Sequence, residues 1–278
     1  MNSSYLMFLF MVLISPLIGL SSSDWVISWL GMEVGMFGLI PLLMLKSGSK
    51  EPVMKYFLIQ SLSSALILIA GILLFSHIFN FSLLFILGMS MKLGFFPGHF
   101  WVISVIENLS WFSNMMVLGP VKIAPFGFLS LIENTNMFLI LSSLSIFAGA
   151  ILGLNQSNIR GMLGASSISH SGWMILAMIY GFLWMYMVIY MMILMFTFIS
   201  LNNFEFLTSS MCLISMSGLP PFMMFLAKMK VFFYLSFNLE YIVFSILIVS
   251  SVISLFYYLK FFYYYSLISK NSKFLFLN

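Results

Sequence analysis

The sequence predicts an all-α, polytopic integral membrane protein with about ten transmembrane helices. The first observation is composition, because 62% of the 278 residues are hydrophobic and only 6% are charged. The mean hydropathy is +1.13. A soluble fold of this length needs polar residues over most of its surface, whereas a chain that faces hydrocarbon is apolar outside as well as inside. The second observation is that the apolar sequence divides into runs of roughly 20 residues, the length of one membrane-crossing helix.

Polar, charged or Gly/Pro-rich stretches separate these apolar runs, and we expect one helix in each run. The first run lacks the basic segment of a signal peptide and is followed by many more spans, so we interpret it as the first helix. Two runs join at Gly181 almost without a loop. The expected spans are residues 4–20, 25–45, 53–76, 82–106, 111–132, 136–154, 161–181, 182–201, 206–234 and 240–265.

The charges of the connections predict the orientation of the chain. When the connections are assigned alternately to the two sides, one side collects Lys46, Lys50, Lys55, Arg160, Lys270 and Lys273. The other side holds Asp24, Glu133 and Glu240 and no basic residue. The positive-inside rule then places both termini in the matrix or cytoplasm and requires an even number of spans.

Ten helices divide into two sets of five, and an odd number in each set makes the second set run inverted through the membrane. We predict a single transmembrane domain over residues 1–278, with one repeat at about 1–135, the second at about 136–265 and a short C-terminal tail at 266–278. The fourth helix of each set, the fourth and ninth overall, carries a Gly/Pro interruption beside a lysine. Interrupted helices at corresponding positions of inverted repeats indicate an ion site. The interruptions are Gly94 and Pro97 near Lys92, and Gly218, Pro220 and Pro221 before Lys228.

Four charged residues fall near the middle of expected spans: Glu33, Lys92, Lys122 and Lys228. Each costs about 2.5 to 3.5 kcal/mol in hydrocarbon, so we expect all four to face the protein interior or water. One interpretation is a set of fixed ion pairs, but three lysines and one glutamate cannot pair off completely. The alternative is a proton relay, since burial disfavours the charged form of a lysine and a neighbouring carboxylate favours it.

His170 is a further relay candidate, because it lies in mid-span and imidazole titrates near neutral pH. The serines around it, Ser166, Ser167, Ser169 and Ser171, are compatible with a water-lined path or with close helix packing. The single cysteine, Cys212, cannot hold an iron–sulfur cluster, which needs about four thiolates. We therefore predict no cofactor and no metal bound by this chain. Nucleic acid is not implied either, because the basic residues flank the spans or lie inside them.

Five sequence blocks, in this order, resemble chain 2 of respiratory complex I, the NADH:ubiquinone oxidoreductase. They cover nearly the whole chain, and Gly-Leu-Pro-Pro alone would be a weak signal. The blocks are Trp29–Glu33, Met91–Trp101, Lys122–Pro125, the stretch from Gly153–Ser157 through Arg160 to Ser166–Trp173, and Gly218–Pro221 leading to Lys228.

The resemblance implies an antiporter-like subunit in which Glu33 pairs with Lys92 on a broken helix, followed by Lys122 and then Lys228. The implied function is proton translocation coupled to NADH oxidation and ubiquinone reduction, as a subunit of the enzyme with no redox centre in this chain. Bacterial members of the family have additional helices, and animal members lack the first three of them. The resemblance implies that this chain also lacks the last helix, and we expect a neighbouring subunit or lipid to cover that edge.

The same resemblance implies where the chain works and with what. NADH, FMN, iron–sulfur clusters and ubiquinone are expected in partner subunits. The expected partners are other membrane-arm subunits, including neighbouring antiporter-like chains, and membrane lipids with cardiolipin as a candidate. The expected location is the mitochondrial inner membrane. Two rival hypotheses remain open: a stand-alone cation/proton antiporter, and a non-pumping structural subunit of the membrane.

Overall fold

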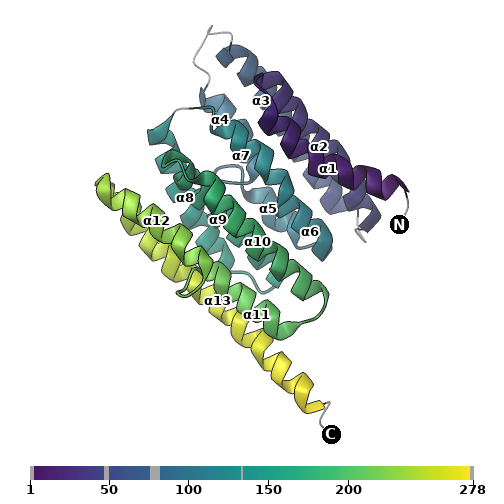
Figure 1. The fold of residues 1–278 in the computed structure, drawn as a ribbon, viewed down its shortest axis with the longest axis vertical. Coiled ribbons are helices and arrows are strands. Elements are labelled where there is room, and N and C mark those ends of the chain that lie inside the picture. The colour runs from purple at the N-terminus through teal and green to yellow at the C-terminus, as the bar shows by residue number, and fades with distance from the viewer. Residues whose placement is uncertain (1–2, 47–49, 76–81, 133, 276–278) are drawn as a thin grey trace. The chain divides into compact units, whose positions relative to one another are not determined.

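The computed structural model describes residues 3–46, 50–75, 82–132 and 134–275. In these ranges every regular element is a helix, with thirteen α-helices, one 3-10 helix and no strand (Figure 1). This confirms the predicted all-α class.

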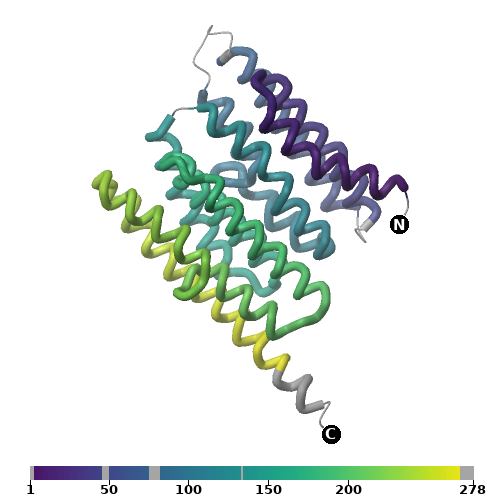
Figure 2. Tube along the Cα trace, viewed as in Figure 1, coloured from purple at the N-terminus to yellow at the C-terminus, as the bar shows by residue number. Residues whose placement is uncertain are grey.

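The helices belong to two compact units, Met1–Thr135 and Asn136–Asn278, each of which is described by itself. Figure 2 traces the chain through both units. The first unit holds α1 (Ser3–Ser21), α2 (Trp25–Lys46), α3 (Glu51–Phe75), α4 (Ser82–Leu93), α5 (Phe100–Ile106), α6 (Trp111–Leu118), η1 (Pro120–Lys122) and α7 (Ile123–Leu129). The second holds α8 (Thr135–Leu154), α9 (Ile159–Ile179), α10 (Leu183–Asn202), α11 (Phe206–Ser217), α12 (Met223–Phe237) and α13 (Tyr241–Leu275).

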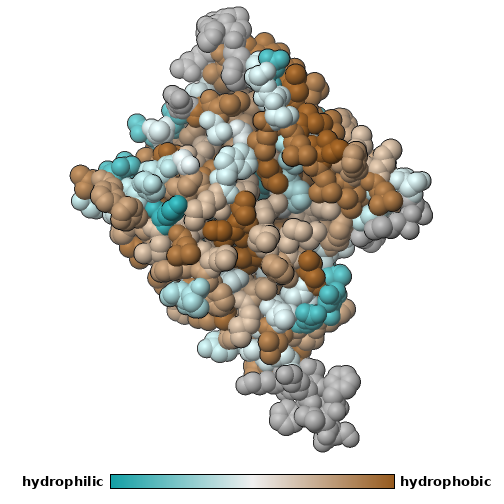
Figure 3. All heavy atoms as spheres, in the orientation of Figure 1, coloured by the Kyte–Doolittle hydropathy of each residue, from teal (hydrophilic) through white to brown (hydrophobic). Residues whose placement is uncertain are grey.

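Eight helical segments of the described chain are long and apolar enough to cross a membrane, with Trp111–Leu129 counted as one. Helices α4 and α11 are apolar but shorter. Large apolar side chains such as Phe10, Leu62 and Val188 are more than half exposed, and hydrophobic residues cover much of the face seen in Figure 3. These observations support a multi-pass membrane protein, because exposed apolar side chains are unfavourable in water but not in contact with lipid.

Small residues let helices α1 and α2 approach closely in the first unit. A Cβ atom added to Gly31 would lie 2.7 Å from the backbone nitrogen of Gly19. In the second unit, a Cβ atom on Gly149 of α8 would lie 2.6 Å from the backbone nitrogen of Ser169 on α9. Close backbone approach through small residues is a common way for membrane helices to associate.

The chain leaves the helical conformation at both Gly/Pro interruptions. Helix α4 ends at Leu93 and α5 begins at Phe100, and Gly94 between them has a φ of +76°. Helix α11 ends at Ser217 and α12 begins at Met223, and the intervening Gly218 has a φ of +82°. Left-handed glycine commonly ends a helix, and proline prevents the helix from resuming at once.

A third interruption differs from the expected continuous helix over 111–132. Helix α6 ends at Leu118, Gly119 adopts φ −105° and ψ −103°, and the short helix η1 precedes α7. The physical reason is the Gly119-Pro120 pair, because proline lacks an N–H and disfavours helical geometry in the residue before it. Lys122 therefore lies at a junction between two half-helices.

The last helix also differs from expectation, since α13 continues to Leu275 in place of ending near residue 265. Residues 266–275 contain neither glycine nor proline, so nothing local stops the helix. The two expected spans that meet at Gly181 are separate helices, with a φ of +78° at that glycine.

The predicted charge asymmetry between the two sides of the membrane rests partly on Glu133 and on the side chains of Lys46, Lys270 and Lys273. These lie outside the described part of the structure.

Candidate functional site

The five residues predicted to form the relay are all buried. The exposed fraction is 7% for Glu33, 6% for Lys92, 5% for Lys122, 5% for Lys228 and 2% for His170. Charged groups inside a membrane protein are expected to face the protein interior, where other groups can stabilise them. Glu33, Lys92 and Lys122 belong to the first unit, and His170 and Lys228 belong to the second.

Glu33 on α2 and Lys92 on α4 form a buried ion pair. The Nζ atom of Lys92 donates to the Oε1 atom of Glu33 at 2.7 Å, and the two side chains are 3% and 9% exposed. A charge-assisted hydrogen bond of this length is among the stronger polar contacts in proteins. The pairing that the family resemblance implies is therefore present.

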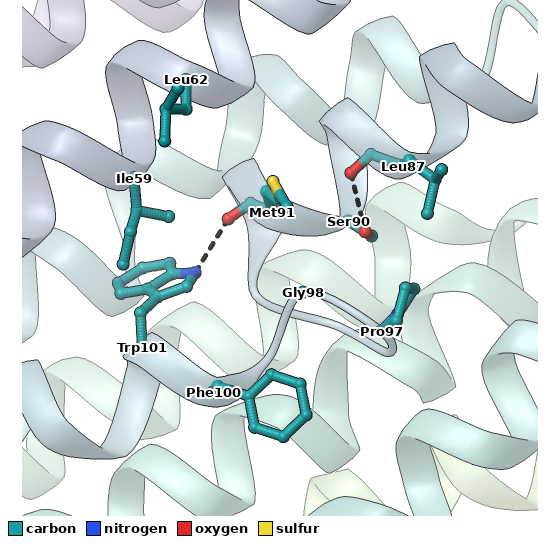
Figure 4. A pocket seen from close by; sticks show the side chains of 9 residues that line it. All are labelled: Ile59, Leu62, Leu87, Ser90, Met91, Pro97, Gly98, Phe100 and Trp101. Atoms are coloured by element: carbon teal, nitrogen blue, oxygen red, sulfur yellow. Dashed lines mark hydrogen bonds between the residues drawn. The ribbon is translucent and has the colours of Figure 1, made fainter.

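The helix interruption after Lys92 frees backbone carbonyl groups, and side chains from elsewhere bond to them. The N–H groups of Gly94 and Phe95 both donate to the carbonyl of Ser90, at 2.9 and 3.2 Å. The carbonyls of Met91 and Lys92 would otherwise lack partners, since the helix does not continue. Trp101 Nε1 donates to the Met91 carbonyl at 2.8 Å (Figure 4), and Gln60 Nε2 donates to the Lys92 carbonyl at 3.2 Å. We call Gln60 and Trp101 the carbonyl clamp.

An apolar pocket is lined in part by Trp101, one of the two residues of the carbonyl clamp (Figure 4). Its volume is about 260 Å³, and its walls include Ile59, Leu62, Leu87 and Phe100. No charged side chain lines it.

Three buried polar atoms of the first unit have no hydrogen-bond partner among the described residues: Tyr56 Oη, His99 Nδ1 and Asn114 Oδ1. Buried polar groups are normally satisfied by protein or by ordered water, so these three atoms are exceptions among the polar groups of the first unit. Tyr56, Asn114 and Gln60 were not identified from sequence. The available signal was a polar side chain within an otherwise apolar run, as with Gln60 between Leu58-Ile59 and Leu62.

Lys228 is held by the second Gly/Pro interruption. Its Nζ atom donates to the carbonyl of Ser217, the last residue of α11, at 2.7 Å. The same Nζ atom lies 5.5 Å from the centre of the Trp173 ring on α9. In the described part of the chain no carboxylate lies within ion-pair distance of Lys228. A carbonyl freed by the interruption and an aromatic face therefore stabilise this ammonium.

His170 on α9 contacts two tyrosine hydroxyls within the second unit. Its Nδ1 atom lies 2.9 Å from Tyr186 Oη, and its Nε2 atom lies 3.4 Å from Tyr258 Oη. The serines near it bond to their own helix, as when Ser166 donates to the Leu163 carbonyl at 2.8 Å and Ser169 to the Ser166 carbonyl at 2.7 Å. The same serines also interact with tyrosines of α13, Ser166 with Tyr258 and Ser169 with Tyr257.

Neither the buried lysines nor the histidines form a metal centre, because the described residues contain no group of three His, Cys, Asp or Glu side chains placed to hold one. The arrangement offers titratable groups beside interrupted helices. Chemically, it can hold and release protons.

Comparison with known proteins identifies relatives of this chain. Residues 76–211 match the family described as NADH:quinone oxidoreductase/Mrp antiporter, transmembrane region. The chain is similar to the NADH-ubiquinone oxidoreductase chain 2 of Albinaria caerulea, at 38% identity over 94% of this chain and 89% of that protein. It is also similar to chain 2 of Lumbricus terrestris, at 32% identity over 89% of this chain and 82% of that protein.

Solved structures share the fold. A chain of respiratory complex I from Thermus thermophilus aligns with a TM-score of 0.84 and 22% identity, covering 93% of this chain and 69% of that chain. A chain of the Mrp complex from Dietzia sp. DQ12-45-1b aligns with a TM-score of 0.80 and 15% identity, covering 91% of this chain and 59% of that chain. Because it shares 38% and 32% identity with the two chain 2 relatives over most of their length, the chain belongs to the NADH-ubiquinone oxidoreductase chain 2 family.

Proposed function

We propose that this chain is a proton-translocating, antiporter-like core subunit of respiratory complex I. The observation that carries the proposal is the buried Glu33–Lys92 ion pair at the end of an interrupted helix. A lysine in this setting is charged while the carboxylate is near and ionised, and loses that stabilisation when the carboxylate moves or is protonated. The pair can therefore switch between holding and releasing a proton.

The proposed relay runs from Glu33 and Lys92 through Lys122 to Lys228, with His170 as a further member. A proton enters from the matrix side, moves laterally along the lysines and leaves towards the intermembrane space. The burial of all five groups supports this role, because ionisable side chains inside a membrane protein commonly belong to proton pathways. The carbonyls at Met91, Lys92 and Ser217 supply polar contacts where the helices are interrupted.

We propose the ten-helix arrangement in two inverted five-helix repeats, at about 1–135 and 136–265. If the segments on either side of an interruption count as one span, α4 joins α5, α6 joins η1 and α7, and α11 joins α12, which leaves ten spans. The boundary between the two compact units at Thr135 and Asn136 supports the division. In this arrangement the fourth and ninth spans are discontinuous, and both termini face the matrix.

The energy for proton transfer must come from elsewhere in the complex. Moving one elementary charge against 100 mV costs about 2.3 kcal/mol, and the sequence contains no nucleotide-binding motif. We propose that NADH, FMN, iron–sulfur clusters and ubiquinone act in partner subunits. The partners are other membrane-arm subunits, including neighbouring antiporter-like chains, with lipids such as cardiolipin at the edge and no nucleic acid. The proposed location is the mitochondrial inner membrane.

Charge-neutralising substitutions at the ion pair test the proposed function. Glu33→Gln and Lys92→Met should each lower the number of protons taken up per NADH oxidised by the intact complex in vesicles. The double variant should be little worse than either single one, because both changes break the same step. Electron transfer to an artificial quinone is measured in the same preparations, so that the amount of active complex is known.

The matched control is the exposed Glu51–Lys55 pair, whose Nζ–Oε1 distance is also 2.7 Å but whose side chains are 75% and 50% exposed. An exposed pair contributes little, so Glu51→Gln and Lys55→Met should leave the proton ratio unchanged. Normal proton uptake by assembled complex carrying Glu33→Gln and Lys92→Met would reject the relay and favour the structural subunit. Proton transport by the chain in the absence of NADH dehydrogenase subunits would favour the stand-alone antiporter.

A further inference from the structure

The His170 imidazole is hydrogen-bonded at both of its ring nitrogens by tyrosine side chains from two other helices. Tyr186 comes from α10 and contacts Nδ1 at 2.9 Å, and Tyr258 comes from α13 and contacts Nε2 at 3.4 Å. His170 is 2% exposed, Tyr186 is 0% exposed and Tyr258 is 1% exposed. All three belong to the second compact unit. The chain of contacts is therefore enclosed by protein.

A tyrosine hydroxyl both donates and accepts a hydrogen bond, and a neutral imidazole has one donor and one acceptor nitrogen. Either tautomer of His170 therefore satisfies both contacts. The two nitrogens lie on opposite edges of the ring, so a proton that enters at one nitrogen can be matched by a proton that leaves at the other. Phenylalanine at either tyrosine position would preserve the packing and remove this property.

Along the axes of α9 and α10, Tyr186 lies nearer than His170 to the connection between these two helices. His170 precedes Gly181 by eleven residues and Tyr186 follows it by five, and α9 packs against α10. In a helical hairpin this difference of six residues places the Tyr186 backbone about 9 Å closer to the α9–α10 connection than the His170 backbone. Tyr186 therefore reaches His170 from the end of the unit where that connection lies.

We propose that Tyr258, His170 and Tyr186 form a hydroxyl–imidazole wire that carries protons through the second unit towards the α9–α10 connection. This inference rests on the proposed function and extends it to two tyrosines. Trp173, three residues after His170 on α9, lies 5.5 Å from Lys228 Nζ. The wire and the last lysine of the relay therefore contact the same helix, α9, at residues three positions apart.

Each transfer through the wire takes up one proton at Tyr258 and releases one proton at Tyr186. Before transfer, Nδ1 carries the ring proton and donates to Tyr186, while Nε2 accepts from Tyr258. The Tyr258 hydroxyl proton moves to Nε2 and is replaced by the arriving proton, and the Nδ1 proton moves to the Tyr186 oxygen as that oxygen releases its own proton onward. One proton enters and one leaves. The ring is left as the other tautomer, with its proton on Nε2, and a second transfer in the same direction requires that proton to be exchanged back to Nδ1.

The test uses Tyr186→Phe and Tyr258→Phe in the intact complex, with His170→Gln as a reference. Proton uptake per NADH is measured in vesicles and related to artificial-quinone reductase activity. Both tyrosine variants should lower the ratio to the value of His170→Gln, and the double variant should fall no further. Tyr190→Phe is the matched control, because its ring lies 5.1 Å from that of His170 and the substitution also removes one buried hydroxyl. It should keep the wild-type ratio.

A wild-type ratio in assembled Tyr186→Phe or Tyr258→Phe complex would overturn the wire, and so would an equal decrease in Tyr190→Phe. If one of the two tyrosine variants fails to assemble, the other decides. Lys92→Met is measured in parallel to separate the two proposals. A decrease in Lys92→Met with normal tyrosine variants would reject the wire alone, whereas normal ratios in all variants would reject the relay as well.

Discussion

The carbonyl clamp leads to a quantitative prediction for Trp101→Phe. The substitution keeps an aromatic ring in place but removes the N–H that donates to the Met91 carbonyl at 2.8 Å. The adjacent backbone cannot replace this donor, because the Phe95 N–H is already bonded to the Ser90 carbonyl at 3.2 Å. The bond is partly buried, and leaving such an acceptor without a partner costs about 1 to 3 kcal/mol.

This cost should appear as easier local opening of the interrupted helix. At about 1.4 kcal/mol per tenfold change, amide hydrogen exchange in the last turn of α4 and in residues 94–99 should accelerate roughly 5- to 150-fold. The assay is hydrogen–deuterium exchange with mass spectrometry on the purified complex, comparing peptides that cover this segment. Exchange elsewhere in the chain should be unchanged.

Trp29→Phe is the matched control, since Trp29 Nε1 also donates to a backbone carbonyl, that of Ser64, at 3.2 Å. Ser64 lies in the interior of α3, where the carbonyl keeps its helical partner, and the substitution should leave residues 94–99 as they are. Unchanged exchange in Trp101→Phe, or equal acceleration in Trp29→Phe, would refute the role given to the clamp.

Three further predictions concern backbone geometry and orientation. In Gly218→Ala the added Cβ would lie 2.9 Å from Lys228 Cδ, so the substitution should displace the lysine side chain and lower proton uptake per NADH. Gly181→Ala has a similar positive φ and no atom within 4 Å of the added Cβ, so it should show only backbone strain of about 1–2 kcal/mol, measured as reduced thermal stability. Equal proton uptake in the two variants would contradict this prediction. Gly31→Leu should prevent α1 and α2 from packing and reduce the amount of assembled complex on native gels, while Leu30→Ala, at a side chain 47% exposed, should not; similar assembly of both variants would argue against the close approach. A C-terminal tag should resist protease in mitoplasts until the inner membrane is opened, and its cleavage beforehand would place that terminus outside the matrix.

The class of the protein and the positions of most helices could be predicted from the sequence, because they depend on local properties. A run of apolar residues is long enough to span a membrane whatever its neighbours are. The interruptions at Gly94 and Gly218 also follow from local chemistry, since a left-handed glycine and nearby prolines end a helix without help from other helices. The interruption at Gly119 was missed although the same signal, a Gly-Pro pair, was present.

The partners of the buried polar groups were decided only by the tertiary structure. Gln60 meets the carbonyl of Lys92, 32 residues away, and Tyr258 meets His170, 88 residues away. Helices that are apolar on all sides give no periodic signal for the face that points inward, so the sequence does not specify their rotation. Packing of small residues such as Gly31 and Gly149 against neighbouring backbones fixes that rotation. The sequence by itself therefore determined which residues lie in the membrane, and helix packing determined which of them meet.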